Sequence, residues 1–167
     1  MLLPIIKTPN PILRQKTREI KEEELKDENF RHLVFDMIET MRQSNGIGLA
    51  APQVGKNASV ICIDAREYDP RGSIKGDKYP ELLSNDSSLI LINPRITWKS
   101  LTKNVIEEGC LSIPGKTGDI KRPKSVRVTC LNLEGKKVKI KAAGLLARVL
   151  QHEIDHLEGI LFTDGIS

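Results

Sequence analysis

Two histidines four residues apart, with a glutamate directly after the first, form the segment of this chain with the clearest chemical meaning. They are His152, Glu153 and His156, an H-E-x-x-H pattern. Residues four apart on a helix lie one above the other, so both imidazoles can bind one ion. Glu153 is rotated by about 100° from His152, where it can take a proton from water. The pattern indicates metal-dependent hydrolysis; the alternative is two core histidines hydrogen-bonded to backbone carbonyls.

The residues around the histidines favour the metal site. Leu145, Val149, His152 and His156 fall at i, i+4, i+7 and i+11, so the histidines continue an apolar stripe that should face the core. An imidazole buried there needs a polar partner. A third ligand is not expected downstream, because Phe162 stands where one class of H-E-x-x-H hydrolases places its next histidine.

The third ligand is therefore sought upstream, where one histidine and three cysteines remain. His32 lies among charged residues of another predicted helix and is expected in solvent. Cys62 and Cys130 sit in strand-like apolar or alternating runs, typical of small buried hydrophobic residues. Cys110 follows a glycine at a predicted strand end, where the side chain is exposed to a site. One thiolate and two imidazoles leave a position open for water, as catalytic metal sites require.

The elements that must position these residues follow from apolar periodicity and from glycine and proline. Short strands in mid-chain between two helices predict an α+β fold. We expect a single compact domain over residues 1–167, with mainly antiparallel strands around the H-E-x-x-H helix and an N-terminal helix packed alongside. The predicted helices span 27–45 and 143–157, the predicted strands 58–64, 89–93, 103–107, 125–131 and 137–141, the last two as a hairpin, and a long surface loop spans 66–88.

The charge and hydropathy of the chain limit the classes of binding partner that we expect. The chain carries 26 Lys+Arg against 22 Asp+Glu, an excess of 4, and the basic residues look scattered, with the densest cluster at 116–124. We expect no DNA partner; an RNA-rich partner such as the ribosome is compatible with this charge, although a solvated face is the simpler interpretation. No run approaches the roughly 18 apolar residues that span a bilayer, so no membrane partner is expected.

The start of the chain does not resemble a signal peptide, and an odd number of cysteines argues against a disulfide framework, so we expect a cytoplasmic protein.

Three segments stand together in this chain, at 46–53, 108–112 and 151–156. They read GIGLAAPQ, EGCLS and QHEIDH. In this order and approximate spacing they closely resemble the three signature motifs of peptide deformylases. The resemblance extends over nearly the whole chain, from Lys7 to Phe162.

The resemblance implies a hydrolase that removes the N-formyl group from the N-terminal formyl-methionine of newly made polypeptides and releases formate. It implies that Cys110, His152 and His156 hold the metal and that Glu153 is the general acid/base. The family prefers ferrous iron, with zinc, nickel or cobalt as substitutes, whereas the ligand types alone would suggest zinc. The implied partners are N-formyl-methionyl nascent peptides and, transiently, the ribosome, in a bacterial cytoplasm.

The resemblance also implies how the substrate is held. The side-chain amide of Gln53 and the backbone N–H of Leu111 would face the oxyanion. The substrate peptide would lie as an added strand along Ile47, Gly48 and Gly109, where bare glycine backbone suits a close approach.

The substrate specificity that the resemblance implies can be related to particular residues. An apolar pocket with Ile47 and Leu145 as walls would favour a methionine side chain. A formyl carbon bears only hydrogen, so a cramped site could admit it and exclude bulkier acyl groups. Gln151 either supports the metal ligands or is solvated.

Two interpretations from other classes remain open at this point. A metallopeptidase that cuts internal peptide bonds would need a downstream ligand, and the eleven residues after His156 offer no convincing one. A non-catalytic domain would use the metal structurally or only bind peptide termini. Structural zinc sites normally close with four protein ligands, and the chain offers three good candidates.

Overall fold

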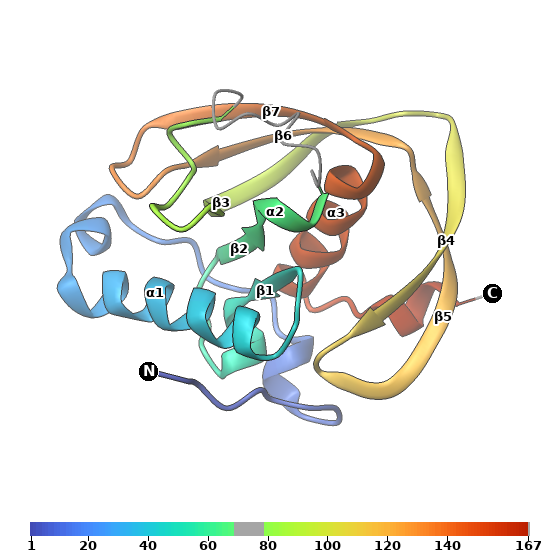
Figure 1. Cartoon of the computed structure of the whole chain (residues 1–167), viewed down its shortest axis with the longest axis horizontal. Coiled ribbons are helices and arrows are strands. Elements are labelled where there is room, and N and C mark those ends of the chain that lie inside the picture. Colours follow the sequence, from blue (N-terminus) through green and yellow to red (C-terminus); the bar gives the residue numbers. More distant parts are fainter. Residues whose placement is uncertain (69–78, 167) are drawn as a thin grey trace.

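The computed structural model of the chain describes residues 1–68 and 79–166 (Figure 1). Within these residues there are two long helices, α1 (Glu28–Gln43) and α3 (Gly144–Leu157), and a short one, α2 (Ala65–Tyr68). Short 3-10 turns occur at η1 (Pro11–Arg14), η2 (Glu22–Lys26), η3 (Ala51–Val54) and η4 (Phe162–Gly165). The strands are β1 (Gly48–Ala50), β2 (Val60–Asp64), β3 (Ser88–Lys99), β4 (Lys103–Cys110), β5 (Ile113–Pro123), β6 (Ser125–Leu131) and β7 (Lys137–Ala143).

The strands form two antiparallel sheets within the described residues. One has five strands in the order β1-β2-β3-β6-β7, and the other is a two-stranded ribbon of β4 and β5. The predicted β6–β7 hairpin is present, and Gly135 in its turn has φ +83°, which glycine adopts without a side-chain clash. The prediction of an α+β fold with mainly antiparallel strands is confirmed.

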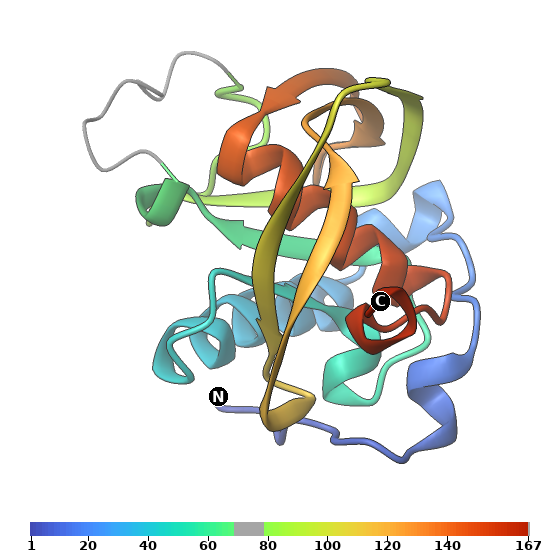
Figure 2. The ribbon, with the colours of Figure 1, turned by 90° about the vertical axis from the view of Figure 1, so that its right-hand side faces the viewer.

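The two long helices cover opposite faces of the five-stranded sheet. Side chains alternate across a strand, so Val60 and Cys62 of β2 pack into the cluster around α1, while Ile61 and Ile63 pack into the cluster around α3. Figure 2 shows the β4–β5 ribbon crossing in front of α3. Because α3 lies between the sheet and the ribbon, its side chains can meet residues of both.

The helices agree with the sequence patterns. The apolar stripe of α1 is buried, and the side chain of Asp27 accepts a hydrogen bond from the N–H of Asn29 as the N-cap. Asn45 ends the segment with φ +56°. As predicted, Cys62 and Cys130 are buried core residues. None of the helices among the described residues combines the length and the hydropathy that a membrane span requires.

Strand β5 was not predicted, and the interpretation of 116–124 as a solvated basic face is wrong in part. Ile120 and Arg122 within it are buried. Pro114, Gly115 and Pro123 argue against a strand, but proline is tolerated at strand ends and on edges of a sheet. A two-stranded ribbon consists only of edges, so β5 can form there.

Two other boundaries differ from the predictions. Strand β3 continues to Lys99, past Asn93 with φ +49° and a register shift that lets the strand pass Pro94. The predicted surface loop 66–88 falls partly on residues 69–78, which lie outside the described residues. Its described part includes most of α2 and an isolated bridge between Leu83 and Leu89.

Candidate active site

Three possible metal ligands converge where the end of β4 meets α3. Cys110, His152 and His156 each offer a donor atom, and these atoms all lie within 4.8 Å of one another. Sγ of Cys110 is 3.3 Å from Nε2 of His156. The helix places the two rings on one face, with centroids 5.0 Å apart, as the four-residue spacing predicts.

The side chain of Glu108 orients His152. Nδ1–H of His152 donates a hydrogen bond to Oε1 of Glu108 at 2.8 Å. Burial alone would lower the pKa of His152, but hydrogen bonds with Cys110 and Glu108 raise it to about 10. Burial, together with the charge on His152, lowers the pKa of His156 to about 3. His156 therefore stays neutral near pH 7, whereas at His152 a metal would have to displace the ring proton that Cys110 and Glu108 stabilise.

Glu153 lies beside these ligands and is almost fully buried. Its Oε2 has no hydrogen-bond partner among the described residues. Burial raises the pKa of Glu153 to about 7, with an opposing effect from His152. A carboxyl group with one unpaired oxygen and a pKa near neutrality can both take and give a proton.

Gly48 on β1 makes room for this carboxylate. A Cβ added to Gly48 would lie 2.7 Å from Oε1 of Glu153, closer than real Cβ contacts allow. The backbone of β1 therefore approaches the carboxylate directly. At Gly109, across the cleft, an added Cβ would make only an ordinary contact of 3.5 Å with Thr117.

The amide of Gln53 also faces the sulfur. Nε2 of Gln53 is 3.4 Å from Sγ of Cys110 and 3.2 Å from Oγ of Ser112. Its Oε1 accepts a hydrogen bond from the N–H of Ala50 at 3.0 Å, which fixes which end of the buried amide points at the site. Leu111 follows Cys110 in the turn between β4 and β5, and its side chain packs beside the α1 cluster.

A cleft of about 170 Å³ opens beside Glu153 and His152. Leu145 is 40% exposed, so the expectation that it faces the core is wrong; it lines this cleft, because the helix begins at the protein surface. Several residues predicted from the sequence line the cleft together: Ile47, Gly48, Gly109, Leu145, His152 and Glu153. A larger hollow, of about 370 Å³, lies beside Arg31 and Phe35, but none of the predicted site residues lines it. The candidate site is therefore identified by its reactive side chains and not by the volume of the hollow.

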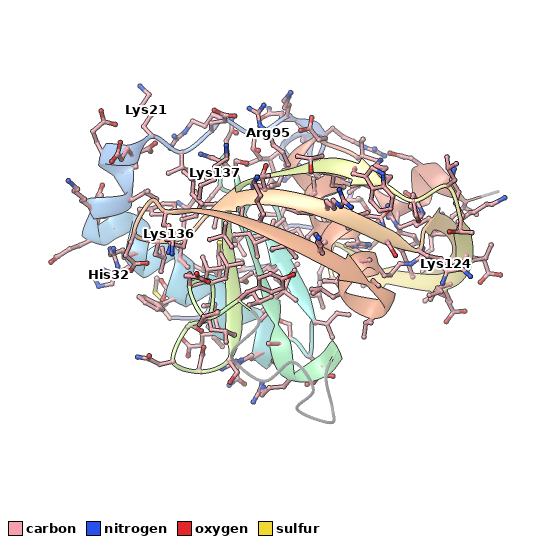
Figure 3. The ribbon with its side chains drawn as sticks, turned by 90° about the horizontal axis from the view of Figure 1, so that it is seen from above. Lys21, His32, Arg95, Lys124, Lys136 and Lys137 are labelled. Carbon is pink, nitrogen blue, oxygen red and sulfur yellow. The ribbon has the colours of Figure 1, made fainter. Side chains whose placement is uncertain are left out.

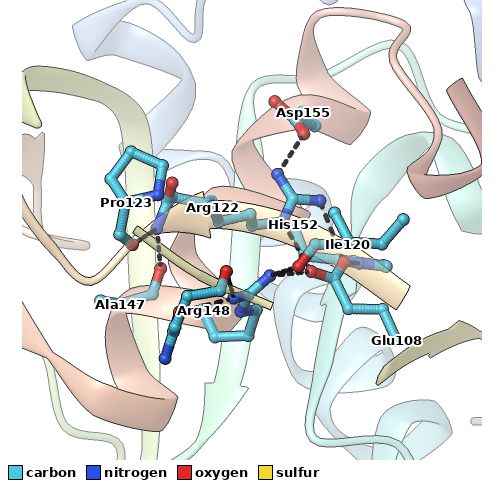
Figure 4. Close-up of polar contacts among 10 residues, drawn as sticks. Glu108, Ile120, Arg122, Pro123, Ala147, Arg148, His152 and Asp155 are labelled. Atoms are coloured by element: carbon cyan, nitrogen blue, oxygen red, sulfur yellow. Dashed lines mark hydrogen bonds and ion pairs between the residues drawn. The ribbon is translucent and has the colours of Figure 1, made fainter. Parts of the chain in front are cut away.

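A buried ionic network, which the sequence did not reveal, supports His152 (Figure 4). Arg122 binds Glu108 through Nε at 2.6 Å and Asp155 through Nη1 at 2.7 Å. Arg148 binds Glu108 at 2.8 Å and Oδ1 of Asn104 at 2.8 Å. Burial alone would raise the pKa of Glu108, but hydrogen bonds from His152, Arg122 and Arg148 lower it well below its usual value.

Two residues of this network, Glu108 and Arg148, could have been inferred from the sequence. Glu108 stands two residues from the predicted ligand Cys110, and a metal-binding imidazole usually donates its second N–H to an acceptor. Arg148 lies four residues before His152, on the face of α3 that turns inward. Gln151, whose role was left open, is buried and donates to the carbonyls of Pro123 and Ala147, so it is not solvated. His32 is exposed on α1, as expected, and does not belong to the ligand cluster.

Comparison with known proteins decides the family. The profile of the polypeptide deformylase family matches residues 2–167. The chain belongs to this family. The peptide deformylase of Thermodesulfovibrio yellowstonii is 45% identical over 166 residues, which cover 99% of this chain and 90% of that protein.

Solved deformylase structures have the same fold. A Met-Ala-Ser-bound peptide deformylase from Acinetobacter baumannii superposes with a TM-score of 0.85 at 36% identity, covering 99% of both chains. The peptide deformylase of Thermotoga maritima superposes with a TM-score of 0.83 at 34% identity, covering 100% of this chain and 99% of that one. This deformylase is therefore a hydrolase.

The residues present fit the metal that a deformylase uses. The donor set is one sulfur and two ring nitrogens, which bind borderline divalent ions such as zinc and ferrous iron. The unpaired Oε2 of Glu153 lies in the same buried site without belonging to the donor cluster. The arrangement suits an ion with protein ligands on one side and reacting groups on the other.

Proposed function

We propose that Cys110, His152 and His156 are the metal ligands with which this deformylase removes the N-formyl group from the N-terminal formyl-methionine of newly synthesised polypeptides. Residues 1–167 form one catalytic domain in this proposal. The observation that carries it is the convergence of the three donor atoms within 4.8 Å beside a buried carboxyl group. When bound, the metal would act as a Lewis acid and lower the pKa of water.

Glu153 moves the proton in this proposal. Its carboxylate accepts a proton from the water that attacks the formyl carbon and returns it to the amine nitrogen that departs. A pKa of about 7 suits both halves of this exchange near neutral pH. Burial excludes bulk water, which would otherwise compete for the same oxygen.

Gln53 and Leu111 stabilise the negative charge that develops on the formyl oxygen. Nε2 of Gln53 points toward Cys110, and its orientation is fixed before substrate arrives by Ala50 and Ser112. The backbone N–H of Leu111 is the second donor. One such preorganised donor contributes roughly 2.7–4 kcal/mol to lowering the barrier.

The cleft holds the peptide and selects methionine. Ile47 and Leu145, together with Ile106 and Val149, give the cleft apolar walls that fit an unbranched thioether side chain. The substrate backbone runs along Ile47 and Gly48 on one side and Gly109 on the other. Because even a single added Cβ at Gly48 would clash with Glu153, little room remains near the carboxylate, which favours formyl over larger acyl groups.

The identity of the native metal ion and the cellular location of the enzyme are further parts of the proposal. We propose ferrous iron as the native ion, with zinc, nickel or cobalt able to occupy the same ligands. The enzyme would work in a bacterial cytoplasm, on nascent chains as they leave the ribosome, through a transient contact. Anaerobic purification followed by metal analysis tests the choice of ion.

A formate-release assay tests the reaction. Formyl-Met-Ala-Ser should yield formate and Met-Ala-Ser, while an unblocked peptide should remain intact. Glu153→Gln keeps the size of the side chain and should abolish turnover while the ion stays bound. Cleavage of internal peptide bonds would favour a metallopeptidase, and full formate release by Glu153→Gln would overturn the proton-transfer role.

A further inference from the structure

One outward face of the five-stranded sheet gathers basic residues that look scattered in the sequence. Arg127 lies on β6, and Lys137, Lys139 and Lys141 alternate along β7; we call these four residues the basic sheet face. Their neighbours Val138 and Ile140 point to the other side and pack into the cluster around α3. Because side chains of a strand alternate between the two faces of the sheet, the cations all lie on the face opposite the core.

The strand register brings these cations close together. Arg127 pairs with Lys141 across β6 and β7, and Thr129 pairs with Lys139. In the part of the chain that the structure describes, no carboxylate lies within 4.0 Å of any of the four cations. Nearby Arg95 and Lys136 are instead paired with Glu19 and Glu81. Figure 3 looks onto this side of the molecule, with Lys136 and Lys137 toward one end, Lys124 at the other and Arg95 between them.

The same face has a hollow with hydroxyl groups and an aromatic ring beside it. A hollow of about 420 Å³ is lined by Thr97 and Thr129 together with Arg127, Lys139 and Lys141. The guanidinium of Arg127 lies over the ring of Trp98, 5.1 Å from its centroid, and Trp98 is 45% exposed. Cations, hydroxyls and an exposed aromatic ring are the groups that bind phosphates and stack on bases.

We propose that the basic sheet face docks RNA through its phosphate backbone, with Trp98 available to stack on an unpaired base. This inference rests on the proposed function, since nascent formylated chains emerge from an RNA-rich particle. RNA fits better than an anionic membrane, because membrane-surface elements insert several apolar side chains among their cations. The side chains between the cations of β7, Val138 and Ile140, are buried, and the exposed apolar side chains near this face are Trp98, under Arg127, and Leu101, which follows the end of β3.

Docking on this face would leave the cleft open. The cleft is lined by residues of α3, of β4 and of the start of β1 with the residue before it, on the side of the sheet that α3 covers. The basic sheet face points away from α3. Bound RNA and a bound peptide can therefore be accommodated at the same time.

Fluorescence anisotropy of the metal-loaded enzyme with a labelled RNA hairpin tests this proposal. The triple variant Lys137→Gln, Lys139→Gln, Lys141→Gln should bind at least about tenfold more weakly at low salt, and the slope of log K against log salt should fall by about 2 to 3. The matched control is Lys103→Gln, Lys116→Gln, Lys121→Gln, which removes the same charge from exposed positions on the β4–β5 ribbon. It should bind RNA almost as well as the wild type.

Other results would overturn the proposal. One is that both triple variants bind the RNA hairpin equally weakly, and another is that the Lys137, Lys139, Lys141 variant binds it with wild-type affinity. A third is that the wild type binds vesicles of phosphatidylserine and phosphatidylcholine but does not bind the hairpin. Trp98→Ala should weaken binding to a hairpin with an unpaired loop about fivefold or more, and unchanged binding would remove the stacking role. Formate release from formyl-Met-Ala-Ser, measured without RNA, separates the two proposals, because it should be the same in the wild type and both triple variants.

Discussion

Nδ1 of His152 donates a hydrogen bond to Oε1 of Glu108 at 2.8 Å, and the same carboxylate binds Arg122 and Arg148. This contact leaves Nε2 of His152 available to a metal. It also ties the ligand on α3 to the strand that carries Cys110. The geometry of the site thus depends on a buried carboxylate between the two elements.

Glu108→Gln should weaken metal binding by about 10- to 100-fold, because the imidazole loses the anionic acceptor that fixes its orientation. Competition with a chelator, monitored by metal analysis, measures this affinity. The matched control is Glu107→Gln, the neighbouring exposed carboxylate, which also lines the cleft but forms no hydrogen bond or ion pair with His152. Metal affinity equal to that of the wild type in Glu108→Gln would show that Glu108 does not orient the ligand.

Arg148→Met should lower the free energy of unfolding of the metal-free chain by about 3–5 kcal/mol, because it leaves a buried carboxylate short of a partner. Arg148 and Glu108 are both about 5% exposed at the side chain. Urea denaturation measures the loss. Arg14→Met breaks an exposed pair with Asp164 and should cost less than about 1 kcal/mol. Equal losses in the two variants would contradict a structural role for the buried network.

Gly48→Ala should reduce kcat for formyl-Met-Ala-Ser by roughly 100-fold while the ion stays bound, because the new Cβ would displace the carboxylate of Glu153. Gly109→Ala is the paired comparison, since its Cβ would make only ordinary contacts, at 3.5 Å with Thr117 and at 3.9 Å with the carbonyl oxygen of Lys116. Its kcat should change much less, even if KM rises. Similar kcat values in the two variants would mean that Gly48 does not set the position of Glu153.

The features that the sequence predicts well are local. The i, i+4 spacing of His152 and His156 needs only a helix, and the stripe of α1 needs only its period. Cys110 could be selected because it is the one cysteine that follows a glycine at a strand end. These inferences depend on neighbours in the chain, so no tertiary contact had to be known.

The features that sequence reasoning missed depend on tertiary contacts. Arg122 stands in a basic cluster that looks solvated, and only the pairing of β5 with β4 turns it toward Glu108. Leu145 lines the cleft, as expected of a pocket wall, but its exposure was not evident from the helical stripe, because it depends on where α3 begins at the surface. Pairing of β6 with β7 likewise decides that the basic residues share one face.

Metal analysis of single-ligand variants tests the central claim most directly. After anaerobic purification, the wild type should hold about one divalent ion per chain, as a single site with three protein ligands requires. Cys110→Ala should hold almost none, while Cys130→Ala, which removes a buried cysteine from β6, should keep the ion. An ion retained at wild-type stoichiometry in Cys110→Ala would contradict the account, because the sulfur would then not be a ligand.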